Sequence, residues 1–107
     1  YVPSAPTITL SEEKTSYENS DLVGITFATP TEGAEIYYTV DNSNTMSGST
    51  LSDPTKTGTK YEGTFNVNIE NISGGKLYIR AAAKKDGKWS RNWLQQLERC
   101  RFSHKQP

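Results

Sequence analysis

The chain has one cysteine, one histidine and one methionine among its 107 residues. The single cysteine, Cys100, excludes an intrachain disulfide and any zinc site built from several cysteines. The single histidine, His104, lies in a polar stretch near the end of the sequence, where we do not expect the rigid geometry of a Ser-His-Asp or Cys-His pair. We therefore expect a protein that is not an enzyme and that holds no cofactor and no metal.

Long hydrophobic runs and net charge are also missing. No segment approaches the roughly 18 consecutive apolar residues of a membrane-spanning helix, so we expect no membrane insertion. Twelve basic residues balance twelve acidic ones. Total charge thus gives no support for nucleic acid as a partner. The length fits one domain with a single hydrophobic core.

Serine, threonine, asparagine, glycine and tyrosine are plentiful, a composition typical of exported, loop-rich β proteins. The sequence opens without an initiator methionine or a signal peptide, and its first residues are proline-rich, as in interdomain linkers. We expect a fragment of a longer protein that is secreted or displayed on a cell surface. Its expected parts are a linker at 1–5, a β-sandwich domain at 6–98 and a C-terminal tail at 99–107.

Hydrophobic residues alternate with polar ones in several short segments separated by turn residues, which predicts β-strands. The segments are 6–10, 22–28, 34–40, 64–70 and 76–84. The dipeptide Asp86-Gly87 predicts a type I′ hairpin turn, and hence a further strand from Lys88. The alternation predicts these core residues: Phe27, Ile36, Tyr38, Phe65, Val67, Leu77 and Ile79. By the same alternation, Val40 shares the face of Ile36 and Tyr38, and Ile69 faces inward with Phe65 and Val67.

Two segments are less regular. Residues 41–60 show no alternation and predict a long loop with at most a short edge strand. Residues 89–102 fit both a helix, by the spacing of Trp93, Leu94, Leu97 and Cys100, and a twisted edge strand. The hairpin turn before them favours the strand. Short strands, frequent turns and no clear helix predict an all-β sandwich of about seven antiparallel strands.

Three stretches of the sequence carry the motif of a known domain family. They are Ile36-Tyr37-Tyr38-Thr39 between Gly33 and Asp41, then Ser52-Asp53-Pro54-Thr55 before Tyr61, and finally Leu77-Tyr78-Ile79-Arg80-Ala81-Ala82-Ala83 before Asp86-Gly87-Lys88-Trp89-Ser90. Together they resemble the chitobiase/β-hexosaminidase C-terminal type domain, whose pattern runs from I-Y-Y-T directly into D-G-S-D-P-T. Here Asn42 replaces the glycine, and an insertion of about a hairpin's length separates Asp41 from Ser52.

This resemblance covers most of the chain and implies both a fold and a role. The fold is an immunoglobulin-like or fibronectin-like β-sandwich, found in bacterial surface proteins and glycan-degrading enzymes. The implied role is a non-catalytic accessory module, acting as a spacer, stalk or attachment domain in a larger exported bacterial protein. Its partners would be the neighbouring domains of the same parent chain, and we expect it to be a monomer.

The alternative is a carbohydrate-binding module that targets a neighbouring glycan-active enzyme. Alternation places Tyr37 and Tyr78 on the outer face of two strands that are neighbours in an immunoglobulin-like sheet. An exposed pair of rings, with Arg80 as polar partner and Trp89 or Trp93 extending it, would suit the apolar faces of a polysaccharide. The other interpretation is that these aromatic residues pack across strands for stability alone.

Two further patterns remain open. Asp41, Asn42, Ser43 and Asn44 offer oxygen atoms to a calcium ion, but such clusters usually cap their own turns, and we expect no metal there. Charge is uneven along the chain: residues 1–75 have 3 basic and 10 acidic residues, and residues 76–107 have 9 basic and 2 acidic ones. Such asymmetry marks either an acidic partner, such as an anionic glycan, or the pairing of basic with acidic strands.

Overall fold

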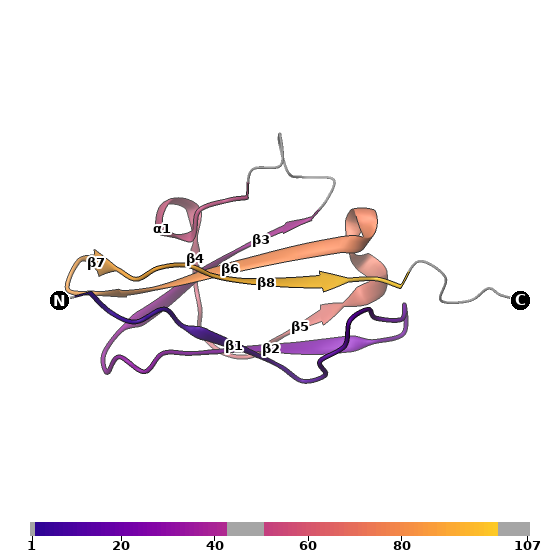
Figure 1. Ribbon diagram of the computed structural model, residues 1–107, viewed down its shortest axis with the longest axis horizontal. Helices are drawn as coiled ribbons and strands as arrows, with labels where there is room; N and C mark the ends of the chain where they lie inside the picture. The colour runs from indigo at the N-terminus through magenta and orange to yellow at the C-terminus, as the bar shows by residue number, and fades with distance from the viewer. Residues whose placement is uncertain (1, 43–50, 101–107) are drawn as a thin grey trace, which may run out of the picture.

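The structure of the protein, a computed structural model, describes residues 2–42 and 51–100. It consists of two antiparallel sheets packed as two layers, with the smaller sheet below the larger one in Figure 1. No helix in these residues is long and apolar enough to cross a membrane. The elements are β1 (Thr7–Leu10), β2 (Leu22–Ala28), β3 (Glu35–Asn42), α1 (Pro54–Thr57), β4 (Thr59–Lys60), β5 (Phe65–Asn68), the 3-10 turns η1 (Ile69–Asn71) and η2 (Ser73–Gly75), β6 (Lys76–Lys85), β7 (Lys88–Trp89) and β8 (Trp93–Glu98).

The smaller sheet has the strand order β1-β2-β5. Ile8 lies opposite Phe27 and Val23 lies opposite Val67, so apolar residues of neighbouring strands share the face that looks into the sandwich. In β1 the burial alternates strictly, because Ile8 and Leu10 are buried while the threonines beside them are exposed. This is the period of two that an extended strand imposes on its side chains.

The larger sheet has the order β4-β3-β6, and β6 pairs with both β7 and β8 on its other side. β7 and β8 follow one line that is interrupted after Trp89. At the interruption, the Ser90 amide donates to the Ala83 carbonyl oxygen, and the Ser90 hydroxyl accepts from the Ala83 amide and donates to Arg91. The Ser90 hydroxyl therefore serves as the acceptor for the Ala83 amide where the backbone ladder is interrupted, and the final strand then continues along β6.

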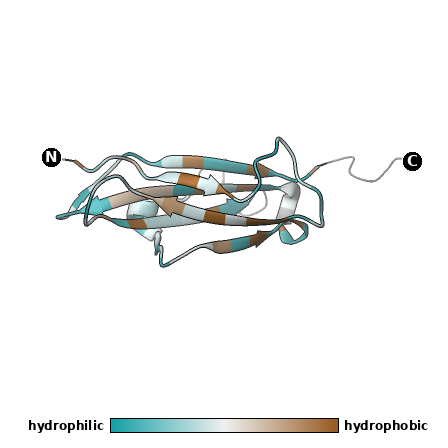
Figure 2. Cartoon of the chain, turned by 90° about the horizontal axis from the view of Figure 1, so that it is seen from below, coloured by the Kyte–Doolittle hydropathy of each residue, from teal (hydrophilic) through white to brown (hydrophobic). Residues whose placement is uncertain are grey.

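The core lies between the two sheets, and Figure 2 shows hydrophobic and hydrophilic residues alternating along the strands that enclose it. Phe27 is at its centre, with the rings of Tyr38, Tyr61 and Phe65 at centroid distances of 5.4, 4.9 and 6.1 Å. Tyr38 and Phe65 stack across the layers at 4.9 Å. Aromatic pairs at these separations add to the stability that burial alone provides.

Much of the expected architecture is confirmed. All five alternating segments contain strands, β4 is a short edge strand in the long loop, and Trp93–Glu98 is a strand and not a helix. Asp86 and Gly87 both have positive φ, at 52° and 78°, as a type I′ turn requires. Residues 2–42 and 51–100 contain eight strands instead of about seven, because the final strand is split at Ser90.

Four core assignments need correction. Val40 is 45% exposed, and it lines an open groove of about 350 Å³ together with Phe65 and Val67. Tyr38, Phe65 and Val67 are half-buried and pack against the buried core. Ile69 is fully buried as expected, but it lies in the 3-10 turn that follows β5. The groove beside the edge strand β5 explains the exposure of Val40, Phe65 and Val67.

Residues on both sides of 6–98 pack onto the sandwich. Pro3 is buried, and the Ser4 amide donates to the Thr31 hydroxyl. At the other end, the Arg99 guanidinium donates to the carbonyl oxygens of Ile69 and Ile72 at 3.2 and 2.9 Å. Contacts with the sandwich therefore continue beyond 6–98 on both sides, to Pro3 and Arg99.

Candidate functional site

Residues 51–58 cross the outer face of the larger sheet and divide it. Helix α1 lies on β3 and β6 there, as Figure 1 shows. Thr39 and Ala82 point outward by strand alternation, yet both are buried, and Pro54 is buried above the sheet. Gly58 closes the crossing: a Cβ atom at this position would stand 2.3 Å from the Pro54 carbonyl oxygen and 3.0 Å from the Tyr37 Cβ.

Hydrogen bonds from β3 and β6 hold the start of this crossing in place. The Asp41 carboxylate accepts from the amide and the hydroxyl of Ser52, both at 2.8 Å. The Thr39 hydroxyl donates to the Ser52 carbonyl oxygen at 3.1 Å. Arg80 donates to the carbonyl oxygens of Leu51 and Ser52 at 3.4 and 3.3 Å. Arg80, expected as a polar partner for a glycan, therefore anchors the chain itself.

Asp53 begins the helical turn of the crossing. Its carboxylate accepts from the amide and the hydroxyl of Thr55 at 2.9 and 2.8 Å, the arrangement of an N-cap. These two hydrogen bonds hold the pKa of the Asp53 carboxyl below its usual value. Pro54 at the first helical position lacks an amide hydrogen that would have no partner there.

Tyr37 and Tyr78 do not form the expected pair. Both are half-buried and lie on the outward side of neighbouring strands, as alternation predicts. However, Tyr37 is opposite Ala82, while Tyr78 is opposite Asp41, four positions further along β6. That is about 13 Å at the usual rise of a strand. Register between strands, which alternation does not fix, separates the two rings, and residues 51–58 cross the sheet between them.

Tyr37 instead contacts Trp89, and five side chains of four strands gather around these rings. We call them the Tyr37–Trp89 cluster: Glu35, Tyr37, Lys60, Lys84 and Trp89. The two rings meet edge to face, with centroids 5.4 Å apart and planes at 70°. The Lys84 ammonium lies over the indole ring, 5.2 Å from its centroid, in a cation–π contact. Glu35, Lys84 and Trp89 are directly opposite one another across β3, β6 and β7.

Ion pairing within the cluster involves Glu35 and Lys60. The carboxylate accepts from the Tyr37 hydroxyl at 3.2 Å and lies 3.3 Å from the Lys60 ammonium. The hydrogen bond from Lys60, followed by its charge, holds the pKa of Glu35 below its usual value, and Glu35 raises the pKa of Lys60. Within residues 2–42 and 51–100, no carboxylate lies within 4.0 Å of the Lys84 ammonium. Lys84 therefore makes no ion pair at this distance, although Glu35 is opposite it and its charge also contributes to lowering the Glu35 pKa.

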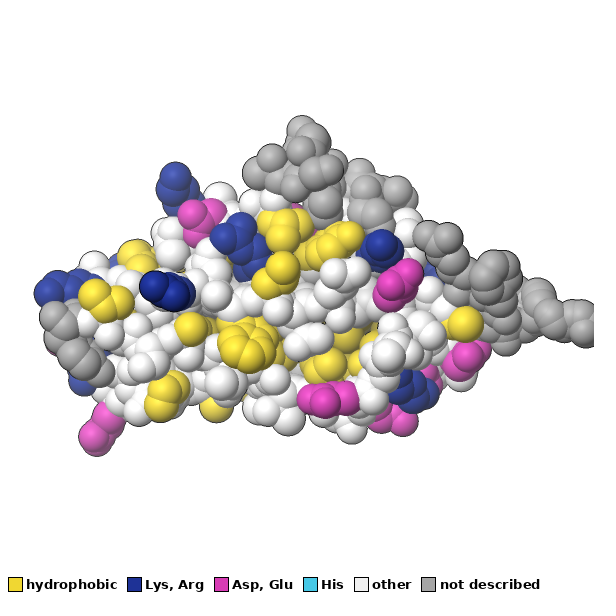
Figure 3. Space-filling model, in the orientation of Figure 1, with side chains coloured by type: hydrophobic (Ala, Val, Ile, Leu, Met, Phe, Trp, Pro, Cys, Tyr) yellow, Lys and Arg dark blue, Asp and Glu magenta, His cyan; other side chains and the backbone are white. Residues whose placement is uncertain are grey.

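Trp93 lies outside the cluster. It is opposite Ala81, whose side chain faces the core, whereas Trp89 is opposite Lys84 on the outer face. The two tryptophans therefore point to opposite sides of the sheet. Trp93 is 40% exposed because β8 forms an edge of the sandwich. Around Tyr78, Leu94 is 52% exposed on the outer face and is opposite Arg80. In Figure 3, which has the orientation of Figure 1, hydrophobic side chains (yellow) lie next to basic ones (dark blue) in the upper half of the molecule, where the larger sheet lies.

Part of the cluster could have been found in the sequence. A two-residue turn at Asp86-Gly87 fixes the pairs Lys85–Lys88 and Lys84–Trp89, so the contact of Trp89 with Lys84 follows from the turn alone. The approach of Tyr37 depends on the register of β3 against β6. No local signal specifies that register, and Lys60 was not expected at all.

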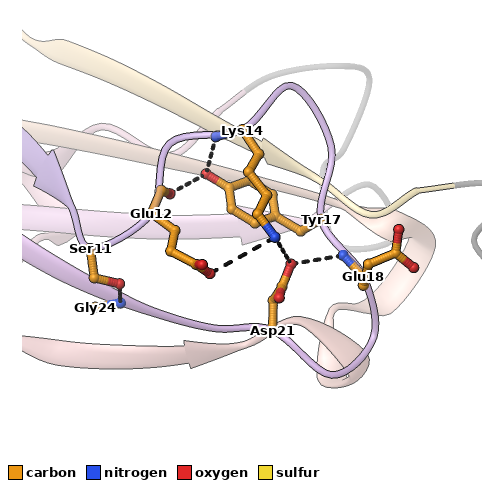
Figure 4. A network of polar contacts seen from close by, with 7 residues as sticks. All are labelled: Ser11, Glu12, Lys14, Tyr17, Glu18, Asp21 and Gly24. Carbon is orange, nitrogen blue, oxygen red and sulfur yellow. Dashed lines mark hydrogen bonds and ion pairs between the residues drawn. The ribbon is translucent and has the colours of Figure 1, made fainter.

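A second polar network, in the connection between β1 and β2, closes one end of the sandwich (Figure 4). Tyr17 is buried, donates from its hydroxyl to the Glu12 carbonyl oxygen at 2.7 Å and accepts from the Lys14 amide at 3.2 Å. Above the ring, the Lys14 ammonium lies 2.9 Å from the Asp21 carboxylate. Every one of these bonds is internal to the connection, which indicates a structural role.

The uneven charge of the sequence is reflected in strand pairing. Basic β6 lies between β3 and β8, and Glu35 is opposite Lys84, while Lys76 is opposite Glu98. Asp41, considered for calcium, is bonded to Ser52, and Ser43, Asn44 and His104 lie outside the described residues. In the described part of the chain, no group of three or more histidine, cysteine or acidic residues is placed to hold a metal ion.

Comparison with models of known protein families, with curated proteins and with solved structures finds no match. The function is therefore argued from the arrangement of the residues.

Proposed function

We propose that this chain is a non-catalytic accessory module of a larger exported bacterial protein, in which it serves as a spacer, stalk or attachment domain. In this proposal it is a monomer, secreted or held at the cell surface, and its partners are the neighbouring domains of its own chain. The fold is an immunoglobulin-like sandwich of the chitobiase/β-hexosaminidase C-terminal type.

The strand order supports this fold. β1, β2 and β5 occupy the positions of strands A, B and E of an immunoglobulin-like domain, and β3, β6 and β8 occupy those of C, F and G. The residues that resemble the family motif also have structural tasks. Asp41 meets Ser52 across the insertion, Asp53 caps α1, and Asp86-Gly87 forms the hairpin turn. The motif residues therefore stabilise the fold, as expected of a domain that acts as a scaffold.

The observation that carries the proposal is the position of the two ends of the sandwich. The chain enters at one end of the long axis and leaves at the other, and β1 and β8 both run along that axis (Figure 1). Tension between neighbouring domains would therefore load the ladders of both terminal strands in shear. In addition, the Tyr17 amide donates to the Glu98 carbonyl oxygen at 2.8 Å, and the Cys100 amide donates to the Tyr17 carbonyl oxygen at 2.7 Å. These bonds tie the last strand to the connection that follows the first.

Single-molecule force spectroscopy tests the spacer role. The protein is pulled from its two termini and, as a control, from the N-terminus and a cysteine introduced by Lys88→Cys at the β6–β7 turn. Both experiments use a Cys100→Ser background, because Cys100 is a free thiol. The turn lies at the same end of the molecule as the N-terminal segment that leads into β1 (Figure 1), so the control opens strands one bond at a time.

We expect one cooperative unfolding event at a clearly higher force between the termini than in the control. Unfolding at the same low force in both geometries would contradict a load-bearing spacer.

One observation favours a second function, the carbohydrate-binding module. The half-buried rings of Tyr37 and Trp89 lie together on an open sheet face with charged side chains around them. Aromatic rings in such a setting suit the apolar faces of sugars. Saturable binding of any soluble glycan, lost in Trp89→Ala, would support this function.

A further inference from the structure

We propose that the Tyr37–Trp89 cluster binds a uronic acid residue of an anionic polysaccharide, an inference that rests on the carbohydrate-binding function above. The sugar ring packs on the aromatic pair, and its carboxylate meets the Lys84 ammonium. The site would serve to attach the module to an acidic glycan.

The aromatic half of the site comes from the perpendicular rings. Tyr37 and Trp89 meet at 70°, so the ring planes form an angled surface instead of a single flat plate. The hydroxyl of Tyr37 is directed to Glu35, and Lys84 approaches the indole ring. The crossing packs beside the Tyr37 side chain, since a Cβ at Gly58 would lie 3.0 Å from the Tyr37 Cβ, and the hydrogen bond to Glu35 holds the other end of the ring. A fixed ring loses less conformational freedom on binding.

The charge of the cluster selects the ligand. Glu35 lies 3.3 Å from the Lys60 ammonium and directly opposite Lys84. The cluster thus has two ammonium groups and one carboxylate, a net charge of +1, and Lys84 is the ammonium group beside the indole. The sequence from 84 to 91 adds to it, with four basic residues and one acidic residue, a net charge of +3. Such a site attracts a carboxylate, gains nothing from the charge with a neutral sugar, and repels an amino sugar.

A nucleic acid strand also combines flat rings with negative charge, but the cluster fits it less well. Binding of a single strand usually follows a basic groove with several stacking rings in succession. Here the next ring on the same face among the described residues is the half-buried Tyr78, four positions away beyond the crossing of residues 51–58. A single uronate residue uses only the two rings that are in contact.

The affinity should be low, in the micromolar to millimolar range, because stacking on an open face and an exposed ion pair each contribute little. The acid should therefore bind about threefold to tenfold more tightly than its uncharged ester, and the preference should shrink as salt is added.

The experiment is a titration of ¹⁵N-labelled protein, followed by amide chemical shifts, with tetragalacturonate. Its methyl ester presents the same sugar faces without charge. Chitotetraose is the neutral comparison, citrate is the simple anion, and a thymidine tetranucleotide represents nucleic acid. Trp93→Phe provides a second readout, since Trp89 is then the sole source of indole fluorescence.

Three variants separate the contributions. Trp89→Ala should abolish binding of both acid and ester, because the stacking surface is gone. Lys84→Gln should keep the ester at its original affinity and bring the acid down to the same level. Trp93→Ala, the matched control on the opposite side of the sheet, should bind like the parent. Thermal denaturation of each variant shows whether it is folded.

The predicted result is saturable shifts at Tyr37, Lys84 and Trp89, with the acid preferred over the ester. Equal affinity for acid and ester would overturn the role of Lys84 while leaving glycan binding intact. Equal affinity for citrate, or tighter binding of the tetranucleotide, would overturn the uronate as ligand. A flat response to every glycan would overturn the carbohydrate-binding function as well and leave the spacer.

Discussion

Asp41 and Ser52 are eleven residues apart in sequence, and the carboxylate of one accepts two hydrogen bonds of 2.8 Å from the other. Ser52, just before α1, therefore lies beside the end of β3. The two bonds hold the start of the crossing of residues 51–58 to the larger sheet.

The Asp41–Ser52 bonds predict that the crossing depends on the carboxylate. Asp41→Ala should lower the free energy of unfolding by about 1–3 kcal/mol, because it leaves the Ser52 amide and hydroxyl without their charged acceptor. Ser52→Ala keeps the amide bond and should lower it less. Urea denaturation measures both. A larger effect for Ser52→Ala than for Asp41→Ala would show that the carboxylate does not hold the crossing.

Gly58 should tolerate no side chain. Its φ of −70° suits any residue, but a Cβ would stand 2.3 Å from the Pro54 carbonyl oxygen. Gly58→Ala should therefore destabilise by about 1–3 kcal/mol, the range for forcing extra atoms into a packed site.

Gly24→Ala is the matched control, since the nearest side-chain atom would be 3.4 Å away. Equal stability of the two variants in urea denaturation would mean that residues 51–58 do not pack closely on the sheet.

The hairpin turn predicts a graded series at Gly87, whose φ is 78°. Gly87→Val should destabilise clearly, because a β-branched residue resists positive φ, and Gly87→Asn should be milder. Apart from Gly87 and its two chain neighbours, no atom of the described residues would lie within 4 Å of a Cβ at this position, so contacts with the rest of the fold do not contribute. A lower melting temperature for Gly87→Asn than for Gly87→Val would contradict the turn type.

We expect the Asp21 carboxylate to account for part of the loss of folding stability at low pH. The hydrogen bond from Lys14, then the Glu18 amide, holds the pKa of its carboxyl below the ordinary 3.8. A lowered folded-state pKa stabilises the fold fully above 3.8, and this contribution disappears as pH falls through 3.8 and then through the folded-state pKa. Asp21→Asn should therefore lose less stability than the parent between about pH 5 and 2. Thermal melts across that range check it, with Glu13→Gln as control. An unchanged acid limb in Asp21→Asn would contradict the assignment.

The sequence predicts where the strands lie better than which of their residues are buried. Alternation located β2 residue by residue, and Asp86-Gly87 placed the last hairpin, because both signals are local. Val40 has the alternation of a core residue but is exposed, since its burial depends on where β5 ends on the other sheet.

The candidate site shows the same limit. The contact of Trp89 with Lys84 follows from a two-residue turn, whereas the contact of Tyr37 with Trp89 needs the register of β3 against β6. Arg80 binds the carbonyl oxygens of Leu51 and Ser52, and no periodicity in the sequence predicts that these residues lie on the sheet. Tyr17, buried in a segment without alternation, was likewise not foreseen as core.

Residues 51–58 divide the outer face of the larger sheet. This division separates Tyr37 from Tyr78 and gives Arg80 its structural role. Nuclear Overhauser spectroscopy tests it most directly. We expect cross-peaks between the Gly58 Hα and the Tyr37 Hβ protons, and between the rings of Tyr37 and Trp89. We expect none between the rings of Tyr37 and Tyr78. Ring-to-ring cross-peaks of Tyr37 with Tyr78, without those of Gly58, would show that residues 51–58 do not cross the sheet.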